Sequence, residues 1–190
     1  MSVIRTGLLV LAFASVAAFG AETRGGKRYV LVQVEGPSAE TGFFVPRFLS
    51  EADDRVPMGD ASLAGARLVD LKSDPNGAAA KAFREKWPAD VWVGLRLDEC
   101  RRKVHQTTVP GFPDPITGAR TYRIETTVEM TCPALVTLVD AASAKELSAT
   151  KVEGHASSDP QSDNAEVDPI EAAAHDAAER AARKSLPKKR

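Results

Sequence analysis

Two stretches decide the fold, DVWVGLRLDE at residues 90–99 and TYRIETTVEMTC at residues 121–132. In the first, Val91, Val93, Leu95 and Leu97 alternate with residues of mixed character, which is the period-two pattern of a β-strand. The second repeats the pattern, with apolar residues at positions 122, 124, 128, 130 and 132. The two predict an antiparallel pair, and PGFPDPITG (110–118) between them predicts the tip of a long hairpin.

The first 20 residues have the three parts of a secretory signal peptide. Arg5 precedes an uncharged, mostly apolar run at residues 6–21, and Ala18 and Gly20 are the small residues of a cleavage site. We predict cleavage after Gly20, or alternatively after Ala18. A membrane anchor is disfavoured because the run is shorter than the roughly 20 apolar residues of a spanning helix. The first cysteine is Cys100, so we expect a periplasmic or secreted protein that is not a lipoprotein.

Charge is nearly balanced along the chain, with 25 Lys and Arg residues, 26 Asp and Glu residues and a net charge of −1. Loss of Arg5 with the signal peptide leaves a net charge of −2. A balance this close to neutral provides no overall field for nucleic acid or anionic lipid, so neither is an expected partner. The basic tail at residues 188–190 is expected to be solvated.

Both cysteines of the chain flank the predicted hairpin, Cys100 at its start and Cys132 at its end. An even number of cysteines in an exported protein predicts a disulfide between them. Strand phase argues against the bond, because a turn centred in the tip places Cys132 opposite Leu97 and Cys100 opposite Glu129, on opposite faces. A bulge at Pro133 or around residues 101–102 would restore it. We expect the bond, since compartment chemistry is a firmer guide than an inferred register.

Three segments before the hairpin complete the amino-terminal half. KRYVLVQVEG (27–36) is rich in β-branched residues and predicts a central strand. The segment at residues 38–65 is ambiguous, because its phenylalanines suit a short helix that Pro46 would interrupt. ARLVDL (66–71) predicts a second short strand.

A helix is predicted in DPNGAAAKAFREKWP (74–88). Asp74 is its expected cap and Pro75 its first residue, and Pro88 ends it. Its buried face is predicted to contain Ala79, Phe83 and Trp87.

The sheet is expected to continue through PALVTLVDAASAKELSATKVEGHA (133–156), with a bulge at Pro133, a turn near residues 141–145 and a further strand. A mobile polar loop follows at residues 157–167. DPIEAAAHDAAERAARKSLP (168–187) then predicts a helix capped by Asp168, with Pro169 in its first turn. Its buried face is narrow and made of small residues, at Ile170, Ala174, Ala177 and Ala181.

This order of elements predicts one α/β domain of mixed α+β type at residues 21–187, between the signal peptide and the basic tail. We expect a layered arrangement with a mixed sheet of about five strands, an antiparallel meander and two to three helices. No internal repeat is present.

The order resembles a group of bacterial envelope domains that includes the amino-terminal domain of TolB, LpoB and the periplasmic part of CsgG. The resemblance rests on RYVLVQV (28–34), ADVWVGLRL (89–97) and the hairpin LVTLVDAASAKELSAT (135–150) before an Ala-rich helix. In those families the last hairpin turns on an Asp and a Gly, and here Asp140 is present without the Gly. The resemblance implies a protein-binding envelope module rather than an enzyme, and it designates no site residue.

Two short motifs match those of penicillin-binding proteins and β-lactamases, SATK (148–151) and SDN (162–164). That chemistry needs Ser and Lys one turn apart on a buried helix. Ser148 and Lys151 lie on a predicted strand, where an odd spacing puts them on opposite faces. We therefore expect no catalytic residues.

Metal and cofactor sites are not expected either. The three histidines, His105, His155 and His175, lack ligand spacing. The acidic residues around the polar loop lack the regular spacing and the glycine of a calcium loop, and a solvated acidic linker is the favoured interpretation. These residues are Asp159, Asp163, Glu166 and Asp168.

Candidate contact residues come from the hairpin tip and one strand. Charged residues on both faces of the predicted hairpin indicate that it projects into solvent; they are Arg101, Arg102, Lys103 and His105 on one strand and Arg120, Arg123 and Glu125 on the other. Phe112 lies at the tip between Pro110 and Pro113, and these three are candidates for partner contact. Trp92 is a fourth candidate, because it alternates onto the face opposite Val91, although burial under a second helix layer is the commoner outcome.

The sequence thus predicts an exported, non-catalytic envelope protein that binds another protein or a cell-wall component through the hairpin. A small periplasmic hydrolase with a site formed only in three dimensions is one alternative. A structural or stress accessory protein is another.

Overall fold

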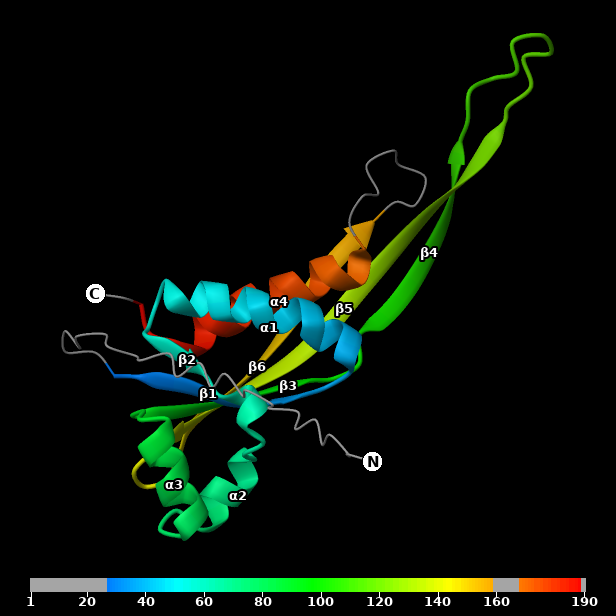
Figure 1. Cartoon of the computed structure of the whole chain (residues 1–190). Helices are drawn as coiled ribbons and strands as arrows, with labels where there is room; N and C mark the ends of the chain where they lie inside the picture. The colour runs from blue at the N-terminus through cyan, green and yellow to red at the C-terminus, as the bar shows by residue number, and fades with distance from the viewer. Residues whose placement is uncertain (1–26, 159–167, 189–190) are drawn as a thin grey trace, which may run out of the picture.

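One mixed β-sheet forms the centre of the protein in a computed structural model that describes residues 27–158 and 168–188 (Figure 1). β1 (Tyr29–Glu35) lies between β2 (Met58–Asp60) and β3 (Val91–Leu97) and is parallel to both. β3 and β4 (Arg101–Pro110) pair in succession with one edge of β5 (Tyr122–Asp140), and β6 (Glu146–Ser158) pairs with its other edge. These last pairings are antiparallel, so the predicted central strand and meander are confirmed.

Helices α1 (Ser38–Asp53) and α4 (Pro169–Ser185) lie side by side across one face of this sheet (Figure 1). Asp168 caps α4 as predicted, accepting a hydrogen bond of 2.9 Å from the N–H of Ile170. The buried face of α4 consists of Ala173, Ala174, Ala177, Ala178, Ala181 and Ala182. Small side chains let a helix approach a strand closely. At Gly154 of β6, a Cβ atom would lie only 2.1 Å from the carbonyl oxygen of Ala173.

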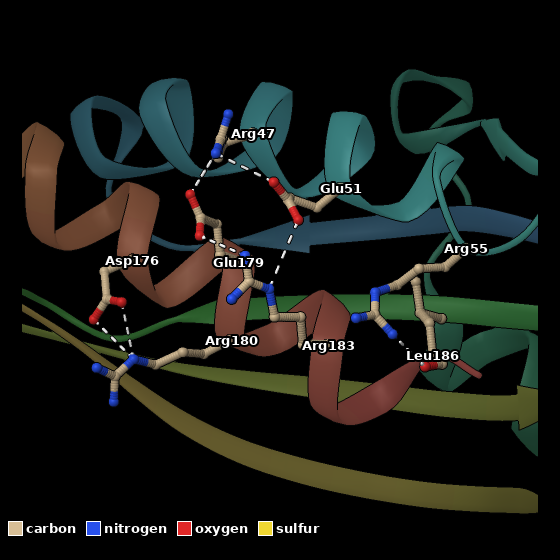
Figure 2. A network of polar contacts seen from close by, with 8 residues as sticks. All are labelled: Arg47, Glu51, Arg55, Asp176, Glu179, Arg180, Arg183 and Leu186. Atoms are coloured by element: carbon tan, nitrogen blue, oxygen red, sulfur yellow. Dashed lines mark hydrogen bonds and ion pairs between the residues drawn. The ribbon is translucent and has the colours of Figure 1, made fainter. Parts of the chain in front are cut away.

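Ion pairs connect α1 to α4 on their outer surface (Figure 2). Arg47 contacts Glu179 of α4 and lies 3.2 Å from Glu51 on its own helix. Arg183 lies 3.1 Å from Glu179 and 3.9 Å from Glu51. The carboxylates therefore alternate with guanidinium groups across the interface. Arg180 pairs with Asp176 on the side of α4 that faces away from α1 (Figure 2).

Helix α1 occupies the segment that was ambiguous in the sequence, and Pro46 lies inside it. Phe44 and Phe48 are fully buried one turn apart, whereas Pro46 and Gly42 face solvent. A proline in a helix removes one hydrogen bond and crowds the carbonyl four residues earlier, here that of Gly42. Because both residues lie on the exposed side, the apolar face continues unbroken.

The opposite face of the sheet carries α2 (Leu68–Ser73) and α3 (Ala78–Lys86), as Figure 1 shows below the strands. The predicted strand at residues 66–71 is therefore wrong. Leu68 and Leu71 are both buried, and a spacing of three residues places them on one side of a helix but on opposite sides of a strand. Gly94 makes room for Leu68, since a Cβ atom there would lie 2.8 Å from its Cδ2 atom.

The helix predicted to begin at Pro75 instead begins at Ala78, with Gly77 as its cap. Its buried residues are Ala80 and Phe83, so the placement of Ala79 on the buried face is corrected. Trp87 is the residue that follows the helix and is half-buried. The turn at residues 141–143 is confirmed, and the side chain of Asp140 accepts 2.7 Å hydrogen bonds from the N–H and hydroxyl of Ser143.

Several predicted features lie outside the described residues. These are the signal peptide, the polar loop except residues 157–158, which belong to β6, and the last two residues of the basic tail. Across residues 27–158 and 168–188, no helix has both the length and the apolar character needed to cross a membrane.

Candidate functional site

A long two-stranded arm extends from the sheet because β5 is much longer than the helices that cover it. β5 has 19 residues, about 60 Å at roughly 3.3 Å per residue. α4 has 17 residues and spans about 25 Å at 1.5 Å per residue. The outer half of β5 therefore leaves the helix layer together with β4 (Figure 1). We call residues 101–131 the projecting hairpin.

One face of the projecting hairpin carries most of its apolar side chains, together with Arg102 and the uncharged polar residues Gln106, Thr108 and Thr126. Partners in an antiparallel pair lie on the same face, so the pairs Val104–Val128 and Thr108–Ile124 share the face of Met130, which belongs to the core beneath α1 and α4. Val128 is still buried, but Val104 is 51% exposed, Ile124 55% and Tyr122 64%. The apolar surface of the core thus continues outward along the hairpin into solvent.

The other face is charged. His105 Nε2 lies 3.1 Å from a carboxylate oxygen of Glu129, and Arg123 forms an ion pair with Glu125. Lys103 pairs with Glu129 across the strands and so lies on the same face. Charge was expected on both faces of the hairpin. The structure gathers these five side chains on one face, because β4 and β5 pair in register, whereas the exposed Arg102 pairs with Met130 and lies on the opposite face.

The tip is a hydrogen-bonded turn. An oxygen of Asp114 accepts hydrogen bonds from the N–H groups of Ile116 at 2.9 Å and Thr117 at 2.7 Å, and these bonds lower the pKa of its carboxyl group. Gly118 has a φ of 66°, which favours glycine. Phe112 is 89% exposed and Ile116 92% exposed. The turn therefore presents two large apolar side chains to solvent.

A disulfide joins Cys100 and Cys132 at the base of the hairpin, so the predicted bond is confirmed. The predicted register was wrong by two residues between β3 and β5 and by three residues between β4 and β5. Leu97 pairs with Ala134 and Arg101 pairs with Thr131, so residues 98–100 lie opposite only residues 132–133. The extra residue on the first strand is the required bulge, and it lies within residues 98–100 rather than at Pro133 or residues 101–102. It brings the two Cα atoms to 4.3 Å.

The four candidate contact residues divide into two groups. Phe112, Pro110 and Pro113 are exposed at the hairpin tip. Trp92 is fully buried, which corrects its candidacy as a partner contact. Its ring packs edge-on against Phe83 of α3 at 6.0 Å, and the guanidinium of Arg84 lies 5.9 Å from its centroid. The helix layer of α2 and α3, underestimated from the sequence, covers it.

The residues of the rejected catalytic and metal sites are dispersed. Ser148 pairs with Leu138 and Lys151 with Leu135 in β6, so the Ser and Lys side chains lie on opposite faces. His105 and His155 lie on strands and His175 on α4, and Asp168 serves as a helix cap. No group of three or more His, Cys, Asp or Glu side chains that could hold a metal occurs in the described part of the chain. The SDN motif (162–164) and the acidic residues Asp159 and Glu166 lie outside the described residues.

Comparison with known proteins gives structural likenesses only. No protein-family model and no curated protein matches the sequence. The chain is similar to a proposed homologue of the neuraminyllactose-binding hemagglutinin from Helicobacter pylori, with a TM-score of 0.46 and 10% identity over 86% of this chain and 88% of that one. It is also similar to lipoprotein GNA1162 from Neisseria meningitidis (TM-score 0.40, 10% identity, 74% and 86% covered). A third likeness is to the PelC dodecamer from Paraburkholderia phytofirmans (TM-score 0.40, 12% identity, 89% and 93% covered).

Proposed function

We propose that this chain is an exported, non-catalytic protein of the bacterial envelope that binds another protein through its projecting hairpin. The observation that carries the proposal is the row of exposed apolar side chains along one face of the hairpin and at its tip. Exposed apolar surface that is contiguous and bordered by polar residues marks interaction sites. The resemblance to the TolB, LpoB and CsgG domains also favours a binding module.

The construction of the hairpin supports the same function. The disulfide at its base, the ladder of pairs from Arg101 to Pro110 and the bonded turn at Asp114 hold its side chains in a defined arrangement. A surface that is ordered before binding loses less conformational entropy when a partner docks. Aromatic anchors such as Phe112 and Tyr122 contribute much of the binding energy in protein interfaces.

Affinity capture from envelope extract tests the proposal. The mature chain is used as bait beside a variant in which a two-residue turn replaces residues 109–119, and beside Phe112→Asp and Ile116→Asp. The matched control is Leu63→Asp, since Leu63 is 99% exposed but lies on the short 3-10 helix η1 (Ser62–Ala64), outside the hairpin. We expect the wild type and the control to retain a common partner that the three hairpin variants lose. Retention of that partner by the variant without the tip would reject the tip as the contact.

A further inference from the structure

A concave basic surface lies at the base of the projecting hairpin, on the sheet face opposite α1, and reaches round the edge strand β6 to the outer side of α4. It is an open depression with a volume of about 530 Å³, formed by β3, β4, β5 and β6 together with the outer side of α4. Its floor is apolar, made by the half-buried Pro133 and Leu135. Five Arg and Lys side chains line it against two carboxylates, an excess of positive charge in a chain whose net charge is −1. The five are Arg96, Arg101, Lys151, Arg180 and Lys184.

Strand register explains why these side chains converge. Arg96 pairs with Leu135, and Leu135 pairs with Lys151, so the two cations flank a leucine in one row across three strands. Arg101, Thr131 and His155 form a second row in the same way. The rows are four residues apart along β5, about 13 Å, and each extends about 10 Å across the strands. The outer two members of each row thus define a rectangle with a basic side chain or a histidine at every corner.

The carboxylates lie between the two rows. Asp98, whose N–H bonds to the carbonyl of Pro133, lies 3.4 Å from Arg96, and Glu153 pairs with Pro133 on the other side. Arg101, Lys151 and Lys184 have no ion pair within 4.0 Å among residues 27–158 and 168–188. Cations that have no ion-pair partner within the described residues are available there to an anionic ligand. The carboxylates of Asp98 and Glu153 lie among these cations and would repel a ligand that carries negative charge along its whole length.

We propose that this surface binds an acidic polysaccharide, a polymer in which carboxylate or sulfate groups alternate with hydroxyl groups. The anionic groups pair with Arg101 and Lys151 at the corners, because guanidinium and ammonium groups form charge-assisted hydrogen bonds with oxyanions. The hydroxyl groups donate to Asp98 and Glu153, and the sugar rings lie over Pro133 and Leu135. The disulfide fixes the site, since Arg101 follows Cys100 and Pro133 follows Cys132.

Isothermal titration calorimetry of the mature chain with oligogalacturonate, a uronic-acid oligomer, tests the inference. We expect saturable binding that weakens at least about tenfold when Arg101→Glu and Lys151→Glu are combined. The matched control is Lys81→Glu, an exposed lysine of α3 outside the site with the same change of charge per residue. Each single charge reversal is measured as well, with circular dichroism to verify folding. Absence of binding by the wild type, or equal loss in the control, would overturn the inference.

The variant Glu153→Gln separates recognition of a sugar from simple attraction of charge. If Glu153 accepts a hydrogen bond from a hydroxyl group, the substitution weakens binding of oligogalacturonate. If only net charge matters, removal of one negative charge strengthens it, and that result refutes the proposal. Inorganic tripolyphosphate is the second probe. Tighter binding of tripolyphosphate than of oligogalacturonate would also refute it, because a dense polyanion offers no hydroxyl donors.

Discussion

Removal of the Cys100–Cys132 disulfide should destabilise the protein by a calculable amount. The double variant Cys100→Ala/Cys132→Ala opens a loop with a sequence separation of 32 residues. The loss of loop-closure entropy in the unfolded state gives about 3.7 kcal/mol for a loop of this size at 25 °C. Cys132 is also fully buried, and truncation of its side chain adds about 1 kcal/mol for the lost packing. We therefore expect a total loss of about 4–5 kcal/mol in the free energy of unfolding.

Guanidinium denaturation followed by circular dichroism measures this difference. At about 2–4 °C per kcal/mol for a domain of this size, the melting temperature should fall by roughly 8–20 °C. Reduction of the wild type with dithiothreitol should reproduce most of the loss, and the double variant should be insensitive to the reductant. A difference below about 1 kcal/mol between oxidised wild type and variant would contradict the assignment of the bond as a main constraint on the unfolded chain.

Three further predictions follow from individual contacts. Gly154→Ala should lower the free energy of unfolding, measured by urea denaturation, by about 3 kcal/mol or more, because its methyl group would lie 2.1–2.2 Å from backbone atoms of α4. Gly42→Ala is the control. Its Cβ atom would meet nothing within 4 Å, so this variant should raise the free energy of unfolding by up to about 1 kcal/mol. Similar costs at both glycines would contradict the close packing of α4. Asp140→Asn should lower stability at neutral pH. Hydrogen bonds from Ser143 depress the pKa of the Asp140 carboxyl below 3.8, so its contribution is present above that pH and disappears as the pH falls through the depressed value. A stability difference that does not shrink as the pH falls through the depressed pKa of Asp140 would be inconsistent with this origin. Val104→Asp should change the free energy of unfolding by less than about 0.5 kcal/mol and still abolish partner capture, since Val104 is exposed on the hairpin. Capture at the wild-type level would exclude the strand portion of the apolar face.

The central strands were predicted well because short runs of β-branched and alternating apolar residues fit a strand better than a helix. β3 and the outer part of β5 were located from period-two patterns, β1 from its run of β-branched residues, and the last helix from its cap and small-residue face. A strand was predicted where α2 lies, because a six-residue segment with two leucines is too short to distinguish the period of a helix from that of a strand. The helix of residues 38–53 was uncertain because Pro46 is unfavourable in isolation, and only the packing of Phe44 and Phe48 against the sheet overrides it.

The site was partly predictable. The Pro- and Gly-rich composition of residues 110–118 predicted the hairpin tip with Phe112 on it, and the expected export of the chain predicted the disulfide. The apolar face of the hairpin was not, since Tyr122 and Ile124 continue the core pattern and read as buried. Their exposure depends on the length of β5 relative to α4, which no local pattern contains. The basic surface was missed for a similar reason, because its rows depend on a register that differs from the inferred one by two residues between β3 and β5 and by three between β4 and β5.

Site-specific photocrosslinking at the hairpin tip in living cells tests the central claim most directly. A photoreactive phenylalanine derivative is placed at Phe112, and in a second strain at Leu63, which is also almost fully exposed and lies on η1. We predict that irradiation links the chain to one discrete protein from position 112 and not from position 63. Absence of a specific adduct from position 112, or the same adducts from both positions, would contradict binding through the projecting hairpin.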